Sequence, residues 1–351
     1  MPYLLCIAFS LILAIIAEKS QKKAPVYIIA IILSLFCGLR GASVGVDTAN
    51  YITNLTYIRE RGILFGGSDI GYSLLSYIMM GYFDNPHYAL LVFAAITNTL
   101  IILRLWEFKE SSSFTMMVLI FLIFHYPYTF NIVRQYLAVS IIFWGTRYLE
   151  RGSYLKYLCF VAIAASMHTS AILGFLLVFI PFGFERFKLT KIRLVGLLGS
   201  VLLIIIGFSV FQSNFDKYTK YFQESETSVH LITIVKTLAV LLVIVANRLF
   251  KNKMFSYSYC KTHPMRKEIP IIYTCGLLLS SFGMFHSFMN RIGFYFMMYE
   301  MPFWGQAILA RKNRIIFILI ISLMLIYSFQ ATMLGGADGL IDYTTFLTES
   351  K

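Results

Sequence analysis

The charged residues that interrupt apolar runs are the first candidates for chemistry in this sequence. Arg134 stands in the segment YTFNIVRQYLAVSII, where Asn131, Arg134 and Gln135 separate two hydrophobic runs. A guanidinium presents a planar fork of donors that suits a phosphate or a diphosphate. The alternatives for Arg134 are a membrane anchor or a structural pair with a neighbouring carbonyl or carboxylate.

Two other arginines lie beside apolar runs, each near residues that could share its task. Arg40 begins the polar segment RGASVGVDTANY, in which Asp47 and Tyr51 are four residues apart. If a helix starts at Asp47, which is a good N-cap residue, Asp47 and Tyr51 share one helix face. Arg291 and Tyr295 have the same spacing in RIGFYF. The alternatives are an interfacial anchor for Arg40 and a plain helix cap for Asp47.

Three further ionisable residues lie within apolar segments. His168 stands in AIAASMHTSAILG, between two apolar runs with almost no loop. An imidazole titrates near neutral pH and can accept a proton, although a lone histidine in an apolar face is often a packing residue. Lys236 is expected to snorkel to the membrane surface. Glu300 lies deeper in its run and could be a counter-ion for Lys236 or Arg291.

The composition requires lipid around these residues. Of the 351 residues, 58% are hydrophobic and 13% are charged, and the mean hydropathy is +0.74. A soluble domain carries about 25% charged residues, so an ordinary cytosolic enzyme is excluded. The net charge of +13 fits a membrane protein that holds Lys and Arg on cytoplasmic loops, and it does not indicate a nucleic-acid partner.

The hydropathy pattern predicts an all-α, polytopic membrane protein that forms a single domain over residues 1–351. About twelve spans are expected. They lie near residues 3–17, 24–39, 86–105, 114–130, 132–149, 154–168, 170–183, 192–210, 230–249, 270–287, 292–310 and 314–332. The segment 71–83 is apolar but short, and we expect it to be an interfacial or re-entrant helix on the outer surface.

The distribution of charge orients these spans. With an external N-terminus, twelve spans place most of the 30 Lys and Arg residues on inner loops, as the positive-inside rule requires. Counting 71–83 as a span spoils this distribution. With the twelve spans, three arginines, a carboxylate and an imidazole all fall on the outer side, which suggests a site for a phosphate-bearing lipid. They are Arg40, Asp47, Arg134, His168 and Arg291.

Several segments carry a resemblance to a known family. They are GLRGASVGVDTANY at 38–51, DIGYSLL at 69–75, NIVRQYLAVSI at 131–141, SMHTSAIL at 166–173, RIGFYF at 291–296 and DYTTFL at 342–347. In these segments the chain resembles the EpsG-like, Wzy-type polysaccharide polymerases of bacteria. The resemblance covers essentially the whole chain. It departs at residues 342–343, where Asp-Tyr stands in place of the more usual Pro-Tyr.

The resemblance implies a glycosyltransferase that moves a growing glycan from undecaprenyl diphosphate onto the next lipid-linked repeat unit. The product would be an O-antigen, a capsule or an exopolysaccharide, made at the outer face of the bacterial cytoplasmic membrane. No nucleotide sugar, metal or other cofactor is expected. The partners would be the lipid-linked oligosaccharide and the bilayer, with a chain-length regulator and a flippase working beside the enzyme.

The resemblance also suggests a role for each candidate residue. Arg134 and Arg291 would bind the diphosphates, Arg40 would be a further phosphate or loop-ordering contact, His168 or Asp47 would be the base, and Tyr51, Gln135 and Tyr295 would orient sugars or side chains. The competing functions are an O-antigen or teichoic-type ligase, a lipid-linked oligosaccharide flippase and a membrane O-acyltransferase.

Overall fold

A computed structural model describes most of the chain as helices. The described residues are 2–61, 69–180, 236, 238, 268–281, 287–309, 314–330, 339–340 and 342–348. The helices are α1 (Pro2–Ser20), α2 (Ala24–Gly38), α3 (Thr48–Arg61), α4 (Ile70–Tyr82), α5 (Pro86–Glu107), α6 (Phe114–Ile120), η1 (Phe121–His125), α7 (Tyr126–Asn131), α8 (Val133–Glu150), α9 (Tyr154–Met167), η2 (Thr169–Phe179), α13 (Glu268–Ser281), α14 (Ser287–Met297), α15 (Glu300–Ala307) and α16 (Arg314–Phe329). The expected all-α fold is confirmed for these residues.

The apolar runs form helices that suit a membrane. Helix α1, helix α5 and the continuous run Phe114–Asn131 are long and apolar enough to cross a bilayer. Several other apolar helices are shorter, between 10 and 17 residues. The expected spans 192–210 and 230–249 lie outside the described residues, apart from Lys236 and Leu238. The count of twelve spans therefore stays a prediction.

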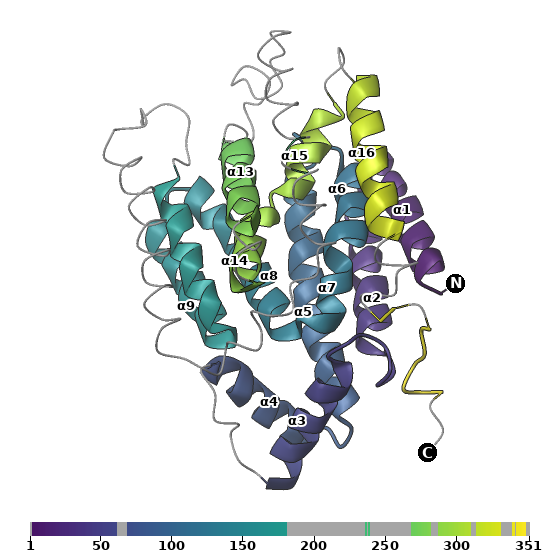
Figure 1. Ribbon diagram of the computed structural model, residues 1–351, viewed down its shortest axis with the longest axis vertical. Coiled ribbons are helices and arrows are strands. Elements are labelled where there is room, and N and C mark those ends of the chain that lie inside the picture. Colours follow the sequence, from purple (N-terminus) through teal and green to yellow (C-terminus); the bar gives the residue numbers. More distant parts are fainter. Residues whose placement is uncertain are drawn as a thin grey trace.

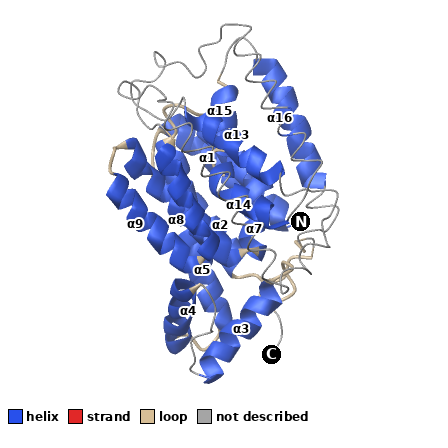
Figure 2. Cartoon of the chain, turned by 60° about the vertical axis from the view of Figure 1, so that its left-hand side comes forward, coloured by secondary structure: helices blue, strands red, loops and turns tan. Residues whose placement is uncertain are grey.

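The helices form an elongated bundle with α3 and α4 across one end (Figure 1). Figure 2 shows the same pair beyond the ends of α5, α8 and α9. We call this the α3/α4 end of the bundle. Helix α4 coincides with the segment expected to be interfacial or re-entrant, and it packs against α3, α5 and α9.

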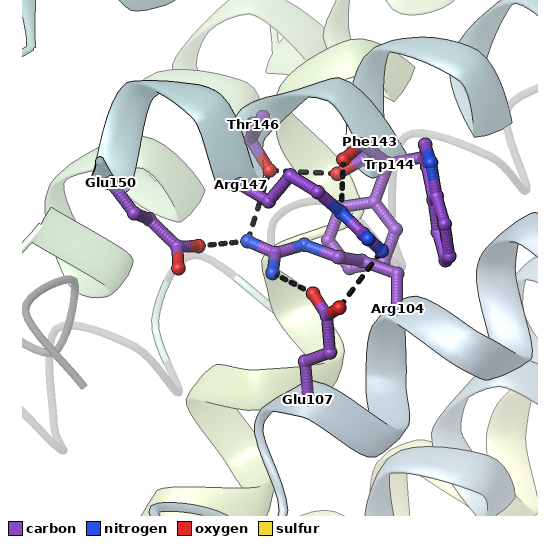
Figure 3. A network of polar contacts seen from close by, with 7 residues as sticks. All are labelled: Arg104, Glu107, Phe143, Trp144, Thr146, Arg147 and Glu150. Carbon is purple, nitrogen blue, oxygen red and sulfur yellow. Dashed lines mark hydrogen bonds and ion pairs between the residues drawn. The ribbon is translucent and has the colours of Figure 1, made fainter. Parts of the chain in front are cut away.

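A network of ion pairs joins the last turns of α5 and α8 (Figure 3). Because α5 begins shortly after α4, these last turns lie at the end of the bundle away from α4. The Arg104 side chain is buried and its guanidinium contacts the carboxylates of Glu107 and Glu150. Arg147 Nη2 lies 2.9 Å from Glu107 Oε1. Two positive and two negative charges balance in the network, which offsets the cost of burying them. Because α8 is fixed here, the position of its first turn, which carries Arg134, is also restricted.

A second ionic cluster is buried in the interior of the bundle. Glu300 is fully buried, and its Oε2 lies 3.0 Å from Lys236 Nζ and 3.3 Å from His125 Nε2. The Tyr273 hydroxyl donates a hydrogen bond of 2.8 Å to Glu300 Oε1. The Lys236 side chain is only 9% exposed, so the expectation that it snorkels to the surface is wrong. The alternative, that Glu300 is its counter-ion, is correct.

The expected span 292–310 is divided. Helix α14 ends at Met297 and α15 begins at Glu300. Pro302 has no N–H with which to bond the carbonyl of Met298, so a regular helix is interrupted here. The break places the Glu300 carboxylate against Lys236 and Tyr273. The expected span 170–183 also differs, because η2 is a 3₁₀ helix.

Candidate active site

One carboxylate joins three elements at the α3/α4 end. Asp69 directly precedes α4, and its side chain is 7% exposed. Its Oδ2 accepts a hydrogen bond of 3.0 Å from Arg134 Nη1 and lies 3.2 Å from His168 Nδ1. Its Oδ1 accepts hydrogen bonds from the Thr169 backbone N–H at 2.9 Å and from the Thr169 hydroxyl at 3.0 Å. Asp69 therefore fixes the start of α4 to the first turn of α8 and to the junction of α9 with η2.

Asp69 is ionised at neutral pH. Burial by itself raises the pKa of this carboxyl, but the hydrogen bonds and the attraction from His168, together with the hydrogen bonds from Thr169, outweigh burial and lower the pKa to about 2. A lowered pKa means that these contacts stabilise the folded protein above the ordinary aspartate pKa. The stabilisation is lost as the pH falls through about 2. The cluster is thus intact throughout the physiological range.

Arg134 is held on one side and open on the other. Its guanidinium bonds to Asp69 and Tyr51 and lies over the Tyr72 ring, 5.7 Å from the ring centre. Burial raises the pKa of the Tyr51 hydroxyl, and the positive charge of Arg134 partly offsets this rise. The Arg134 side chain is still 45% exposed. An arginine fixed in this way keeps donors available for an anionic group.

His168 lies in the short break between two helices. Its backbone is extended, with φ −155° and ψ 119°, between the last residue of α9 and the first residue of η2. Its ring is 22% exposed, and Nδ1 faces Asp69. The break lets the imidazole reach the carboxylate in front of α4.

Gln135 and Tyr295 connect the neighbouring helices next to this cluster. Gln135 follows Arg134 and donates a hydrogen bond of 2.6 Å to the backbone carbonyl of Arg291. The Tyr295 hydroxyl lies 2.9 Å from Ser170 Oγ, two residues after His168. Both side chains are buried, whereas Arg291 is exposed. Gln135 and Tyr295 therefore hold α8, η2 and α14 together. The bond from Gln135 places the backbone of Arg291 next to the turn of α8 that carries Arg134.

Arg40 and Asp47 occupy a separate part of the α3/α4 end. Arg40 is buried and donates to the Cys37 carbonyl at 2.6 Å, to the Phe130 carbonyl at 3.0 Å and to Thr48 Oγ1 at 2.9 Å. These contacts are those of a loop-ordering residue, which is one of the two roles expected for Arg40. Asp47 precedes α3, and its carbonyl accepts the Tyr51 N–H at 3.1 Å, so it stands where a helix cap is expected.

The described part of the C-terminal segment, 339–348, packs on this loop. The Tyr343 ring stacks on Phe36 with ring centres 4.0 Å apart, and Phe346 stacks on His87 at 4.4 Å. The backbone N–H of Gly41 donates to the Thr344 carbonyl at 2.9 Å. The end of the chain thus supports the loop that contains Arg40, even though Asp-Tyr at 342–343 departs from the more usual Pro-Tyr.

The sequence placed Arg134, His168 and Tyr51 among the candidates, and the structure brings these three together. The residue that unites them, Asp69, was not a candidate. It belongs to the segment DIGYSLL, which contributed to the resemblance. A carboxylate directly before a helix is usually an N-cap, but no cap hydrogen bond from the Asp69 side chain to α4 is formed.

A close approach between α4 and α9 maintains the cluster and can be tested. A Cβ on Gly71 would lie 2.3 Å from Ser166 Oγ and 2.8 Å from Ser166 Cβ, whereas a Cβ on Gly81 of the same helix meets nothing within 4 Å. We expect Gly71→Ala to push α4 away from α9 and to destabilise the protein by about 1–3 kcal/mol, as overpacking of a tight contact does. Gly81→Ala should leave the stability unchanged, since the space there is open. Thermal unfolding in detergent measures both; equal effects of the two changes would contradict the tight contact.

The fold and the site define an all-helical membrane protein with a cluster of carboxylate, imidazole and guanidinium at one end of its bundle. A family model described as the EpsG family matches residues 23–345. The chain therefore belongs to the EpsG family, a family of Wzy-like polysaccharide polymerases. The resemblance found in the sequence is confirmed. No curated protein and no solved structure matches the chain.

Proposed function

We propose that this protein extends a polysaccharide by transferring the growing glycan from undecaprenyl diphosphate onto the next lipid-linked repeat unit. The observation that carries the proposal is the Asp69 cluster, in which a half-exposed Arg134 lies beside the imidazole of His168. Membership of the EpsG family supports polysaccharide polymerisation, and the cluster supplies groups that suit a lipid diphosphate.

The transfer needs charge stabilisation more than bond activation. The acceptor hydroxyl oxygen forms a bond to the anomeric carbon of the growing chain, while the bond from that carbon to the diphosphate oxygen breaks. The electron pair leaves with the diphosphate, and Arg134 and Arg291 neutralise its developing charge. His168 or Asp47 accepts the hydroxyl proton. No step in this scheme requires a nucleotide sugar.

We place the α3/α4 end at the outer face of the cytoplasmic membrane. The proposal of twelve spans, with most Lys and Arg on the inner side, supports this orientation. Thr53 and Arg151 are both exposed. Thr53 is in α3, at the α3/α4 end. Arg151 follows Glu150, which belongs to the Arg104 network at the other end of α8. In a cysteine-free background, we expect Thr53→Cys in intact cells to react with an impermeant thiol reagent, and Arg151→Cys to react only after the cells are opened. The reverse pattern would contradict the orientation.

A strain that lacks this protein tests the proposal in the cell. We expect its surface glycan to carry a single repeat unit in place of long chains. A ligase would leave full-length polymer on the carrier lipid, and a flippase would leave single units on the inner side. A chain-length regulator and a flippase are the protein partners that we propose for the polymerase.

A further inference from the structure

We propose that Asp69 positions His168 as the base of the transfer, with the Nε2 atom of His168 accepting the proton of the acceptor hydroxyl. This inference rests on the proposed function, and it selects His168 over Asp47. In it Asp69 is a positioning residue, because it acts through His168 and Arg134 and does not itself contact the sugar.

The contact between Asp69 and His168 determines which ring nitrogen is free. Asp69 Oδ2 lies 3.2 Å from His168 Nδ1, in a place where the carboxylate side chain is 7% exposed. An ionised carboxylate is only an acceptor, so it favours the tautomer with a hydrogen on Nδ1. The lone pair of the neutral ring is then on Nε2, at the side away from Asp69. The His168 side chain is 22% exposed, and we place the acceptor hydroxyl at the Nε2 side of the ring.

The same carboxylate oxygen connects the proposed base to the proposed diphosphate ligand. Asp69 Oδ2 accepts from Arg134 Nη1 at 3.0 Å as well as facing His168 Nδ1. Both groups are therefore within reach of one reacting centre, where the hydroxyl loses its proton and the diphosphate gains negative charge. When Nε2 takes the proton, the positive ring that forms is stabilised by the Asp69 carboxylate, as in a carboxylate–histidine pair of a hydrolase.

Asp47 does not have this geometry. The Asp47 backbone carbonyl accepts a hydrogen bond from the Tyr51 N–H at the start of α3. The charge of its carboxylate acts on the Tyr51 hydroxyl. Asp47 has no contact with His168 among the interactions of the described residues. Tyr51 bonds to Arg134, so Asp47 is two contacts away from the cluster.

A purely structural role for Asp69 predicts different behaviour. The two bonds from Thr169 also attach Asp69 to the start of η2. If the carboxylate only attaches α4 to the bundle, its loss should add to the effect of losing His168. If it acts through the imidazole, its loss should matter little once the imidazole is gone, because residues that act as a unit are not additive.

A double-mutant cycle separates the two roles. Polymerisation rates are measured with purified full-length protein and lipid-linked repeat units, for Asp69→Asn, for His168→Ala and for the double variant. We expect each single change to lower the rate on the order of a hundredfold or more, and the double variant to lose far less than the product of the two single losses. Asp69→Asn should lower kcat and leave KM nearly unchanged. Multiplied losses in the double variant would overturn the inference.

Two variants serve as matched controls for this cycle. Asp84→Asn makes the same substitution as Asp69→Asn. Asp84 also pairs with an arginine at this end, Arg59, but its side chain is exposed to solvent. Thr169→Val removes one bond to Asp69 Oδ1 and keeps the backbone bond. We expect Asp84→Asn to retain full activity and Thr169→Val to lose far less activity than Asp69→Asn. A loss in Thr169→Val as large as that in Asp69→Asn would favour the structural role.

A nitrogen NMR spectrum of isotope-labelled histidine tests the inference without any reaction. The His168 signals, assigned by their loss in His168→Ala, should show a hydrogen on Nδ1 and a free Nε2 in the otherwise unchanged protein. The opposite tautomer would overturn the inference even if polymer is formed. Absence of polymer together with the expected tautomer would instead count against the proposed function.

Discussion

Replacing Arg134 with lysine should abolish long polysaccharide chains while the protein remains folded and expressed. Asp69 and Tyr51 hold part of the guanidinium, and the side chain, which is 45% exposed, still offers donors to the oxygens of a diphosphate. The single ammonium of lysine cannot hold Asp69 and supply a planar fork to the diphosphate. Loss of one preorganised donor costs about 3 kcal/mol, or on the order of a hundredfold or more in rate.

Chain length on gels measures this effect, with Arg59→Lys as the matched control. Arg59 lies at the same end of the bundle and pairs with an exposed aspartate, so its conversion to lysine should leave chain length unchanged. Arg134→Ala should shorten the chains at least as much as Arg134→Lys, and His168→Ala should also abolish long chains. Near-normal chains in Arg134→Lys, at matched expression, would show that Arg134 is only an anchor or a structural pair.

Replacing Glu300 with glutamine should destabilise the protein severely. Glu300 is fully buried, and Lys236 Nζ lies 3.0 Å from its Oε2. Breaking a buried ion pair by removing one partner costs about 3–5 kcal/mol, because the other charge is left buried and unpaired. Lys236→Ala should also be severe, whereas a lysine that only snorkels could be removed with little effect.

Thermal unfolding in detergent measures the loss, with two comparisons. Glu110→Gln removes an exposed carboxylate that is paired with Lys109, and it should change the unfolding temperature little. The double variant Glu300→Gln with Lys236→Met should recover much of the lost stability, because no unpaired charge remains. A small effect of Glu300→Gln, similar to that of Glu110→Gln, would mean that the buried pair is not important for stability.

The helices were predictable where apolarity alone determines them. The expected spans 24–39 and 86–105 closely match α2 and α5, because a run of apolar side chains between polar ends is a local property. The break between α14 and α15 was not predicted. It depends on Pro302 together with the partners of Glu300, which come from distant parts of the chain.

The candidate site was predictable in part for the same reason. Arg134 and His168 are conspicuous because polar groups are costly within apolar runs. Asp69 was overlooked because it precedes a helix, where an aspartate is an ordinary residue, and its partners lie 65 and 99 positions further along the chain. Lys236 was misjudged because a long side chain that snorkels and one that pairs with a buried carboxylate look identical in sequence.

Purified protein supplied with undecaprenyl-diphosphate-linked repeat units, in the presence of EDTA, gives the decisive result. If arginines stabilise the leaving diphosphate, the products should form a ladder of lipid-linked chains that grow by one repeat unit at a time, and Arg134→Lys should stop the ladder at the starting unit. A reaction that requires added Mg²⁺ or Mn²⁺ would contradict the role given to the arginines. A preparation that flips or transfers the unit without ever lengthening it would contradict the polymerase itself.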